Sequence, residues 1–319
     1  MQSLLLPLVY FALLNTVIVA VGYLFVNRYY IILSWLMTIA GIAAIHFIFL
    51  YQHPALRMLA IIATTFSGVK VITTAETYKG KAVKLSFGQW FVFALAWAGM
   101  RPQAFETLGG RALPGAWPIV RFGISRLVLG ALLILLTRFM AAQGMDNDVL
   151  ITAILLVGLS FVLHFGLLSI SAGMWRLSGA DTYFLFRSPA KSKTIAEFWG
   201  KRWNLAFIEM SAIAVFRPLR KRFGEGWALL ASFLFSGLLH ELAISLPVKQ
   251  GYGLPLVYFA IQGIAVITER ALLHRRPSLL QNAILAKTWL FFWLVVPMPL
   301  LFHWAFLQQI ILPIAGITT

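Results

Sequence analysis

The sequence predicts an all-α fold, a polytopic transmembrane helical bundle with about 8–9 spans plus short re-entrant or interfacial helices. Hydrophobic residues make up 61% of the chain and charged residues 11%, whereas soluble domains are nearer half apolar and a quarter charged. Many apolar runs approach the ~20 residues that a helix needs to cross a bilayer. These runs are unbroken rather than alternating, which disfavours a transmembrane barrel.

The expected elements follow these runs in chain order. Ser3–Phe25 lacks a basic start and is too long for a signal-peptide core, so it predicts a retained first helix. The other full-length runs are Tyr30–Tyr51, Leu56–Ala75, Ile119–Ala141, Val149–Gly173, Trp227–Leu246, Leu254–Leu273 and Ala286–Gln308. Leu85–Met100 and Leu205–Phe216 are short for a crossing, which favours re-entrant, tilted or interfacial segments. Neither a repeat nor a linker divides the chain, so we expect one membrane-embedded domain over residues 1–319.

Basic residues outnumber acidic ones, with 26 Lys and Arg against 10 Asp and Glu. In a membrane protein this excess is typical of cytoplasmic loops, although it also suits an anionic substrate or anionic lipid headgroups. Binding of nucleic acid is not expected, because the basic residues accompany no reading motif. Basic clusters stand on both sides of Leu205–Phe216. If that segment dips into the membrane and returns, both clusters lie on the cytoplasmic face, as we predict.

His240 lies inside the apolar run Trp227–Leu246 and is followed by Glu241. Polar and ionisable residues at membrane depth are costly and usually functional. Burial favours a neutral ring, which is able to accept a proton as a general base does. Ser236 stands four residues earlier on the same helical face, so its hydroxyl is a candidate partner for the ring. Glu241 points about 100° away, toward a basic partner or the same cavity.

The segment FWGKRWN, Phe198–Asn204, concentrates aromatic and basic side chains beside the short apolar run. Such residues are common at a membrane interface. Asn204 fits that explanation less well, and its amide is able to orient a carbonyl or stabilise an oxyanion. The candidate substrate-binding residues are Trp199, Lys201, Arg202 and Trp203 of this segment, together with Ser236.

Several other chemistries lack their signatures. The chain has no cysteine, which excludes disulfides, a thiol nucleophile and cysteine-ligated zinc. HELAI lacks the second histidine of a zinc-protease motif, and a serine-hydrolase elbow is missing.

Together, FWGKRWN at Phe198–Asn204 and SGLLHELAISLP at Ser236–Pro247 resemble the wax synthase-like branch of the membrane-bound O-acyltransferase (MBOAT) superfamily. Asn204 and His240 are 36 residues apart (240 − 204), which suits that branch. The resemblance covers about residues 187–273. It implies transfer of a fatty acyl group from acyl-CoA to the hydroxyl of a lipophilic alcohol, as in a wax ester synthase. His240 matches the catalytic base, Asn204 the second signature residue, and Glu241 a glutamate that follows the base in many relatives.

The residues and the resemblance predict one mechanism, in which His240 deprotonates the alcohol and Asn204 orients the thioester or stabilises the oxyanion. Arg202, Lys201 and the basic loop Arg187–Lys193 are expected to hold the CoA phosphates. Acyl-CoA is then a co-substrate, and we expect neither a metal nor another cofactor. Membrane lipids are expected partners, a homo-oligomer is an open possibility, and the expected location is a bacterial inner membrane, or the endoplasmic reticulum in a eukaryote.

Two alternatives stay open at this point. In a polytopic transporter or channel, His240 and Glu241 would line a proton or substrate pathway. A non-catalytic lipid-binding protein would bind lipid and form no ester.

Overall fold

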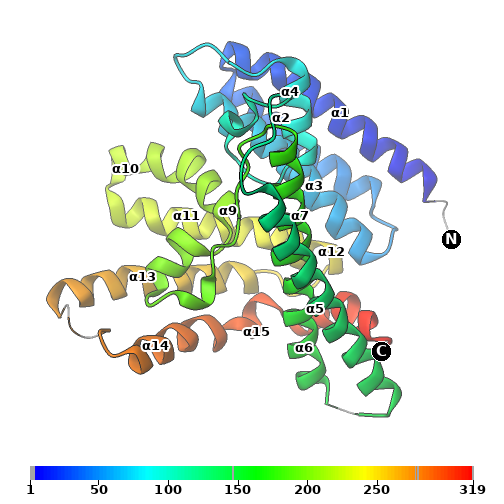
Figure 1. The fold of residues 1–319 in the computed structure, drawn as a ribbon, viewed down its shortest axis with the longest axis vertical. Coiled ribbons are helices and arrows are strands. Elements are labelled where there is room, and N and C mark those ends of the chain that lie inside the picture. Colours follow the sequence, from blue (N-terminus) through cyan, green and yellow to red (C-terminus); the bar gives the residue numbers. More distant parts are fainter. Residues whose placement is uncertain (1–3, 146, 277, 279, 318–319) are drawn as a thin grey trace. The chain divides into compact units, whose positions relative to one another are not determined.

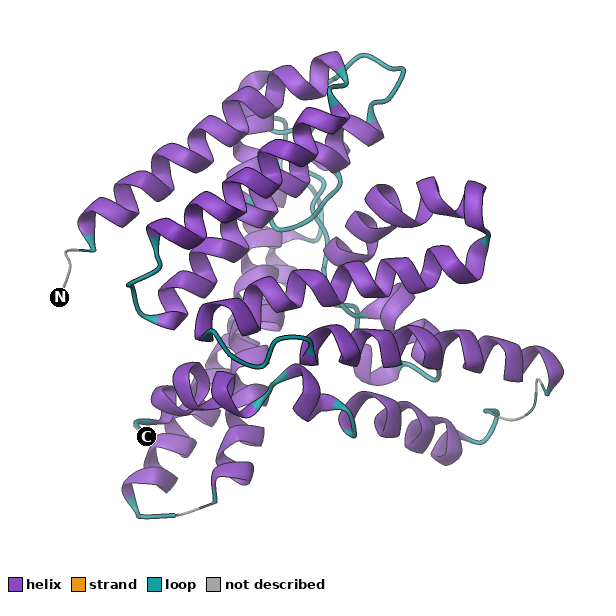
Figure 2. Cartoon of the chain, turned by 180° about the vertical axis from the view of Figure 1, so that it is seen from behind, coloured by secondary structure: helices purple, strands orange, loops and turns teal. Residues whose placement is uncertain are grey.

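A computed structural model describes residues 4–145, 147–276, 278 and 280–317. Across these residues the chain forms helices and loops and no strand (Figure 2). Eight of the helices are long and apolar enough to cross a membrane. The prediction of an all-α polytopic bundle with about 8–9 spans is therefore confirmed, and the chain is a multi-pass membrane protein. The residues divide into two compact units, Met1–Phe184 with Leu307–Thr319, and Leu185–Phe306. The single domain over residues 1–319 stays a prediction.

The first unit contains the N-terminal spans, the short helix α4 and the last turns of the chain. Its helices are α1 (Leu5–Arg28), α2 (Ile31–Ile48), α3 (Pro54–Thr77), α4 (Phe87–Ala96), η1 (Pro102–Phe105), α5 (Ala116–Ala142), α6 (Asp148–Ser160), η2 (Phe161–Leu167), α7 (Leu168–Leu177), η7 (Leu307–Ile311) and η8 (Leu312–Ala315). The helices α1, α2 and α3 pack together, and α5 packs along α6, η2 and α7. The run Val149–Gly173 thus becomes one long helix with a π-helical turn in its middle.

The short helix α4 ends at Ala96, where a buried lysine binds the carbonyls at the helix end. The Nζ of Lys70, on α3, donates hydrogen bonds to the carbonyl oxygens of Phe93 and Trp97. These carbonyls have no partner inside the helix, and a lysine at a helix C-terminus satisfies them. The segment Leu85–Met100 is therefore a short helix, as its length predicted.

The second unit carries both signature segments. Its helices are η3 (Pro189–Lys191), α8 (Ile195–Glu197), η4 (Phe198–Arg202), α9 (Leu205–Ser211), η5 (Ala212–Phe216), α10 (Arg217–Phe223), α11 (Glu225–His240), η6 (Glu241–Ser245), α12 (Leu246–Val248), α13 (Leu254–Arg275), α14 (Ala283–Val295), α15 (Met298–Leu301) and α16 (Trp304–Phe306). The helix α11 packs against η5 and α10 on one side and against α13 on the other, and α13 contacts α14 (Figure 1).

The segment after Asn204 differs from its prediction. The elements α9, η5 and α10 follow one another without a break, so residues 205–223 form one helix. The π-helical turn η5 accommodates Pro218, which has no backbone N–H. The chain turns only at Gly224, whose φ of 82° is a conformation that glycine adopts readily. The return expected within Leu205–Phe216 is absent, and the two basic clusters lie at opposite ends of this helix.

The last expected span is also corrected. Helix α14 ends at Val295, and a short turn separates it from helix α15, which begins at Met298. Pro297 and Pro299 lack the N–H groups that a continuous helix requires, which explains the break. The apolar stretch that is long enough to cross is Ala283–Leu301, and Trp304–Ala315 forms a separate shorter apolar helical segment.

Two buried polar side chains of α13 hold the FWGKRWN segment. The carboxylate of Glu269 accepts hydrogen bonds from the backbone N–H groups of Ile195 (2.8 Å) and Ala196 (2.9 Å). It also accepts one from Trp289 Nε1 at 3.0 Å. Two turns earlier, Gln262 Oε1 accepts a hydrogen bond from Trp199 Nε1 at 3.0 Å. Because lipid offers no hydrogen bonds, these contacts satisfy the start of α8 and fix the segment on α13.

We expect Glu269→Leu to release this segment. The substitution leaves two backbone donors and one indole donor unpaired, at a cost of roughly 1–3 kcal/mol for each buried group. In detergent, the unfolding midpoint should fall, and trypsin should cut faster at the basic residues between Arg187 and Arg202. The control is Glu225→Leu, which breaks an exposed ion pair with Arg270 and should change stability by about 1 kcal/mol or less. Equal protease resistance of wild type and Glu269→Leu would contradict the anchoring role.

Candidate functional site

His240 is the last residue of α11, and its ring is oriented by the preceding turn of that helix. The distance between His240 Nδ1 and the backbone oxygen of Ser236 is 2.7 Å. A carbonyl oxygen only accepts hydrogen bonds, so Nδ1 carries the proton in the neutral ring. Nε2 is then the unprotonated nitrogen, and it makes no hydrogen bond with the residues that the structure describes. The partner predicted for this ring was the Ser236 hydroxyl, but the backbone of the same residue takes that role.

Two phenylalanines hold the His240 ring from neighbouring helices. The ring centroid of His240 lies 4.3 Å from that of Phe259 on α13 and 5.4 Å from that of Phe207 on α9. Phe259 is buried, with 3% of its surface exposed. The ring therefore has an apolar wall on α13 and a second one on α9, while the π-helical turn η6 begins directly after it.

Asn204 begins the helix that carries Phe207. Its backbone is left-handed, with φ 47° and ψ 74°, and asparagine tolerates this conformation better than most residues. Its Oδ1 accepts a hydrogen bond from the backbone N–H of Phe207 at 3.2 Å, which caps α9. The side-chain Nδ2 makes no hydrogen bond within the described part of the chain. One atom of the amide therefore has a structural role, and the other remains a free donor.

Phe207 connects the two signature residues. Its backbone N–H binds Asn204, and its ring contacts His240. The helices α9 and α11 also pack together. The structure thus brings Asn204 and His240, 36 residues apart in the sequence, to neighbouring helices with one residue between them.

Glu241 follows His240 directly and binds the start of α13. Its Oε1 accepts a hydrogen bond from the backbone N–H of Leu256 at 3.0 Å, one of the N–H groups that a helix leaves unsatisfied. Its Oε2 is buried and makes no hydrogen bond with a described residue. Leu256 precedes Phe259 by three residues, so Glu241 fixes the turn of α13 that carries the wall behind His240.

The tryptophans of FWGKRWN are packed into the unit. Besides its bond to Gln262, Trp199 contacts Phe259 with ring centroids 5.6 Å apart. Trp203 stacks on Phe198 at 5.4 Å and 14°. Both rings therefore position the segment, and the ring of Trp199 lies next to the phenylalanine that contacts His240.

Arg202 is paired inside its own segment. Its Nη2 lies 2.7 Å from Glu197 Oε1, and its Nη1 donates to the carbonyl oxygen of Arg187 at 3.2 Å. Partial burial acts to raise the pKa of the Glu197 carboxyl, but hydrogen bonds from the Lys193 backbone N–H and from Arg202 lower it, and the resulting pKa lies below the usual value. Glu197 thus remains ionised at neutral pH, so Arg202 holds the loop closed rather than standing free for a phosphate.

Other cations of this segment are exposed. Lys191, Lys193 and Lys201 have exposed side chains, and Arg187 does as well. Lys201 lies in the last turn of the π-helix η4, on the surface of the segment that α13 anchors. Positive charge at this surface is available for an anionic group of a ligand.

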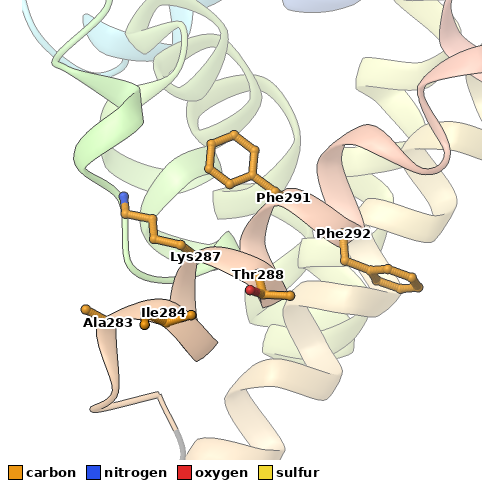
Figure 3. Close-up of a pocket in the computed structure, with 6 residues that line it drawn as sticks. All are labelled: Ala283, Ile284, Lys287, Thr288, Phe291 and Phe292. Carbon is orange, nitrogen blue, oxygen red and sulfur yellow. The ribbon is translucent and has the colours of Figure 1, made fainter.

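Two surface grooves occur in the described part of the chain, and neither is lined by the predicted site residues. The larger one, about 650 Å³, runs along a face of α14 and is lined by Ala283, Ile284, Lys287, Thr288, Phe291 and Phe292 (Figure 3). Lys287 projects from this face toward the basic loop, and its Nζ donates hydrogen bonds to the carbonyl oxygens of Ala190 and Ser192. The second, about 280 Å³, lies between α10 and α11. The acyl tunnel expected among Phe- and Leu-rich helices stays a prediction.

The sequence reasoning missed Gln262 and Glu269 as residues that position the site. Both lie in the apolar run of α13 and are almost fully buried. Their signal was the one used for His240, namely a polar side chain at membrane depth. Applied to every span, that signal would have identified both.

Comparison with known proteins gives the same family. Residues 183–261, which include Trp199, Asn204, His240 and Glu241, match the model of the membrane bound O-acyl transferase family. A long-chain-alcohol O-fatty-acyltransferase of Simmondsia chinensis is 32% identical over 72 residues, 20% of this chain and 20% of that protein. A probable long-chain-alcohol O-fatty-acyltransferase of Arabidopsis thaliana is 29% identical over 113 residues, 33% of each chain.

Another probable long-chain-alcohol O-fatty-acyltransferase of Arabidopsis thaliana matches over a longer stretch, 26% identical over 179 residues, 53% of this chain and 50% of that protein. These alignments span between a fifth and a half of the relatives' own length. They bear out the resemblance that the motif pair indicated: residues 183–261 are similar to the membrane bound O-acyl transferase family, and the relatives found are named as long-chain-alcohol O-fatty-acyltransferases, in keeping with the wax synthase-like branch.

Proposed function

We propose that this protein transfers a fatty acyl group from acyl-CoA to the hydroxyl of a lipophilic alcohol, with His240 as the general base. The observation that carries the proposal is the hydrogen bond between His240 Nδ1 and the Ser236 carbonyl oxygen. It leaves Nε2 as a proton acceptor next to apolar walls, and a base acting on an alcohol requires such an acceptor. The names of the relatives, which act on long-chain alcohols, support this acceptor class.

The reaction needs one proton acceptor and one donor to the thioester oxygen. As the alcohol oxygen attacks the thioester carbonyl carbon, its proton passes to His240 Nε2. The developing oxyanion accepts a hydrogen bond from Asn204 Nδ2, the amide atom that the helix cap does not use. The C–S bond then breaks, and the CoA thiolate takes the proton from Nε2. The products are an ester and CoA, and the apolar walls limit competing hydrolysis by water.

In this proposal Glu241 is a positioning residue rather than a proton carrier. Its bond to the Leu256 N–H fixes the turn of α13 that places Phe259 against the His240 ring. The exposed cations Arg187, Lys191, Lys193 and Lys201 attract the CoA phosphates. A bacterial cell membrane as the location remains a prediction of the sequence, and a homo-oligomeric state remains an open possibility.

Replacing His240 tests the base directly. In purified His240→Ala, transfer of a labelled acyl group from acyl-CoA to a long-chain alcohol should fall by about 10²–10⁴, the usual contribution of a general base. The protein should still elute as a folded species in detergent, because the ring contributes one hydrogen bond, to its own helix. Turnover equal to that of wild type would refute the assignment. Acyl-independent solute flux in liposomes, lost in the same variant, would favour the transporter alternative.

Asn204 combines a structural and a chemical role, and two substitutions separate them. Asn204→Asp keeps an oxygen that accepts from the Phe207 N–H but loses the amide donor. We expect an unchanged unfolding midpoint and a turnover about 10²–10³ lower, the cost of removing one oxyanion donor. Asn204→Ala should in addition lose about 1 kcal/mol of stability with the cap. Full activity in Asn204→Asp would show that the residue only caps α9.

Exposed and paired cations should affect kinetics differently. Lys193→Gln/Lys201→Gln should raise KM for acyl-CoA, more strongly at low salt, and leave kcat nearly unchanged, because exposed charges are screened by salt. Arg202→Gln breaks the ion pair with Glu197 and should mainly lower the unfolding midpoint. A fall in kcat without a change in KM in Lys193→Gln/Lys201→Gln would exclude a role in holding the CoA phosphates.

A further inference from the structure

The end of the helical hairpin formed by α10 and α11 joins an apolar groove to a cluster of positive charge. The groove is lined by Leu219, Phe223, Trp227 and Ala231. Trp227 is 70% exposed and Phe223 is 53% exposed. Aromatic residues of this kind are enriched at the level of the lipid headgroups. The groove therefore has the chemistry of a surface in contact with lipid at the membrane interface.

Two arginines border this groove. Leu219 and Phe223 lie on one face of α10, and Arg220 and Arg222 project about 80° to either side of that face, at 100° per residue. The guanidinium of Arg222 lies 5.4 Å from the ring centroid of Phe223, and that of Arg220 lies 5.8 Å from that of Phe216. Of these two rings, Phe223 lines the groove, so the Arg222 guanidinium lies beside the groove, where arginine is able to bind a phosphate with two N–H groups.

The charge of α10 is not neutralised by the protein. In the described residues, none of its basic side chains forms an ion pair with an Asp or Glu. The acidic residue that follows, Glu225, is paired with Arg270 of α13. The two other cations of α10, Arg217 and Lys221, project about 140–180° away from the groove.

We propose that this groove binds an anionic glycerophospholipid, with its phosphate bound by Arg222 beside Phe223, Arg220 adding positive charge on the other flank, and an acyl chain along Leu219, Phe223 and Trp227. A zwitterionic lipid offers the same chains but no net negative charge, so the arginines make the site selective. The site involves no residue of the proposed acyl transfer, and a binding measurement tests it without turnover.

The test uses quenching of Trp227 by brominated acyl chains in nanodiscs of phosphatidylcholine. A minor fraction of either brominated phosphatidylglycerol or brominated phosphatidylcholine is added. Trp227 is one of 11 tryptophans, so its signal is the difference between each protein and the same protein carrying Trp227→Phe. We expect brominated phosphatidylglycerol to quench this signal at a much lower fraction than brominated phosphatidylcholine.

Two variants of equal net charge show whether the groove is the cause. Arg220→Gln/Arg222→Gln should weaken the preference for phosphatidylglycerol about tenfold, and Arg217→Gln/Lys221→Gln, on the opposite face, by less than about threefold. All four positions are exposed, so both variants should keep the helix content and elution volume of wild type. Equal quenching by the two lipids in wild type, or equal losses in the two variants, would overturn the proposal. Loss of the preference on adding acyl-CoA would assign the arginines to CoA phosphates instead.

Discussion

The hydrogen bonds of Glu269 to the start of α8 are the contact on which the proposed site depends. They tie the FWGKRWN segment to α13, and Gln262 adds a second attachment through Trp199. The same helix supplies Phe259, which contacts the His240 ring, and its first turn is bound by Glu241. One helix therefore positions both signature segments. Within lipid each polar group needs a partner from the protein, so the buried carboxylate and amide serve as fixed attachment points.

The two signature residues are placed by backbone groups more than by one another. The Ser236 carbonyl orients His240, and the Phe207 N–H binds Asn204. Each residue uses one polar atom for its own position and leaves a second atom free, Nε2 in His240 and Nδ2 in Asn204. A general base needs a free acceptor atom, and an oxyanion hole needs a free donor atom. Because the other polar atom already holds each side chain in place, the side chain loses little entropy when the substrate binds.

Much of the fold followed from the sequence because the bilayer sets the length of an apolar helix. The sequence also singled out the residues of the motif pair. The structure of the polar stretches was predicted less well from the sequence. The apolar segment was expected to end at Phe216 because a basic cluster follows it, yet Arg, Lys and Leu favour helix, and the helix continues to Phe223. Arg202 looked free because its partner, Glu197, lies five residues earlier on a turn that only the fold creates. Glu269 was not singled out from the sequence, yet it is buried and accepts the backbone N–H groups at the start of α8.

If His240 and Asn204 act together on one thioester, a double-mutant cycle reveals their coupling. Rates of ester formation would be compared for His240→Ala, Asn204→Asp and the double variant, each with an unchanged unfolding midpoint. Residues that act as a unit give strongly non-additive losses. The double variant should therefore be about as slow as the slower single variant. Losses that multiply in full would contradict it, since the two side chains would then act independently.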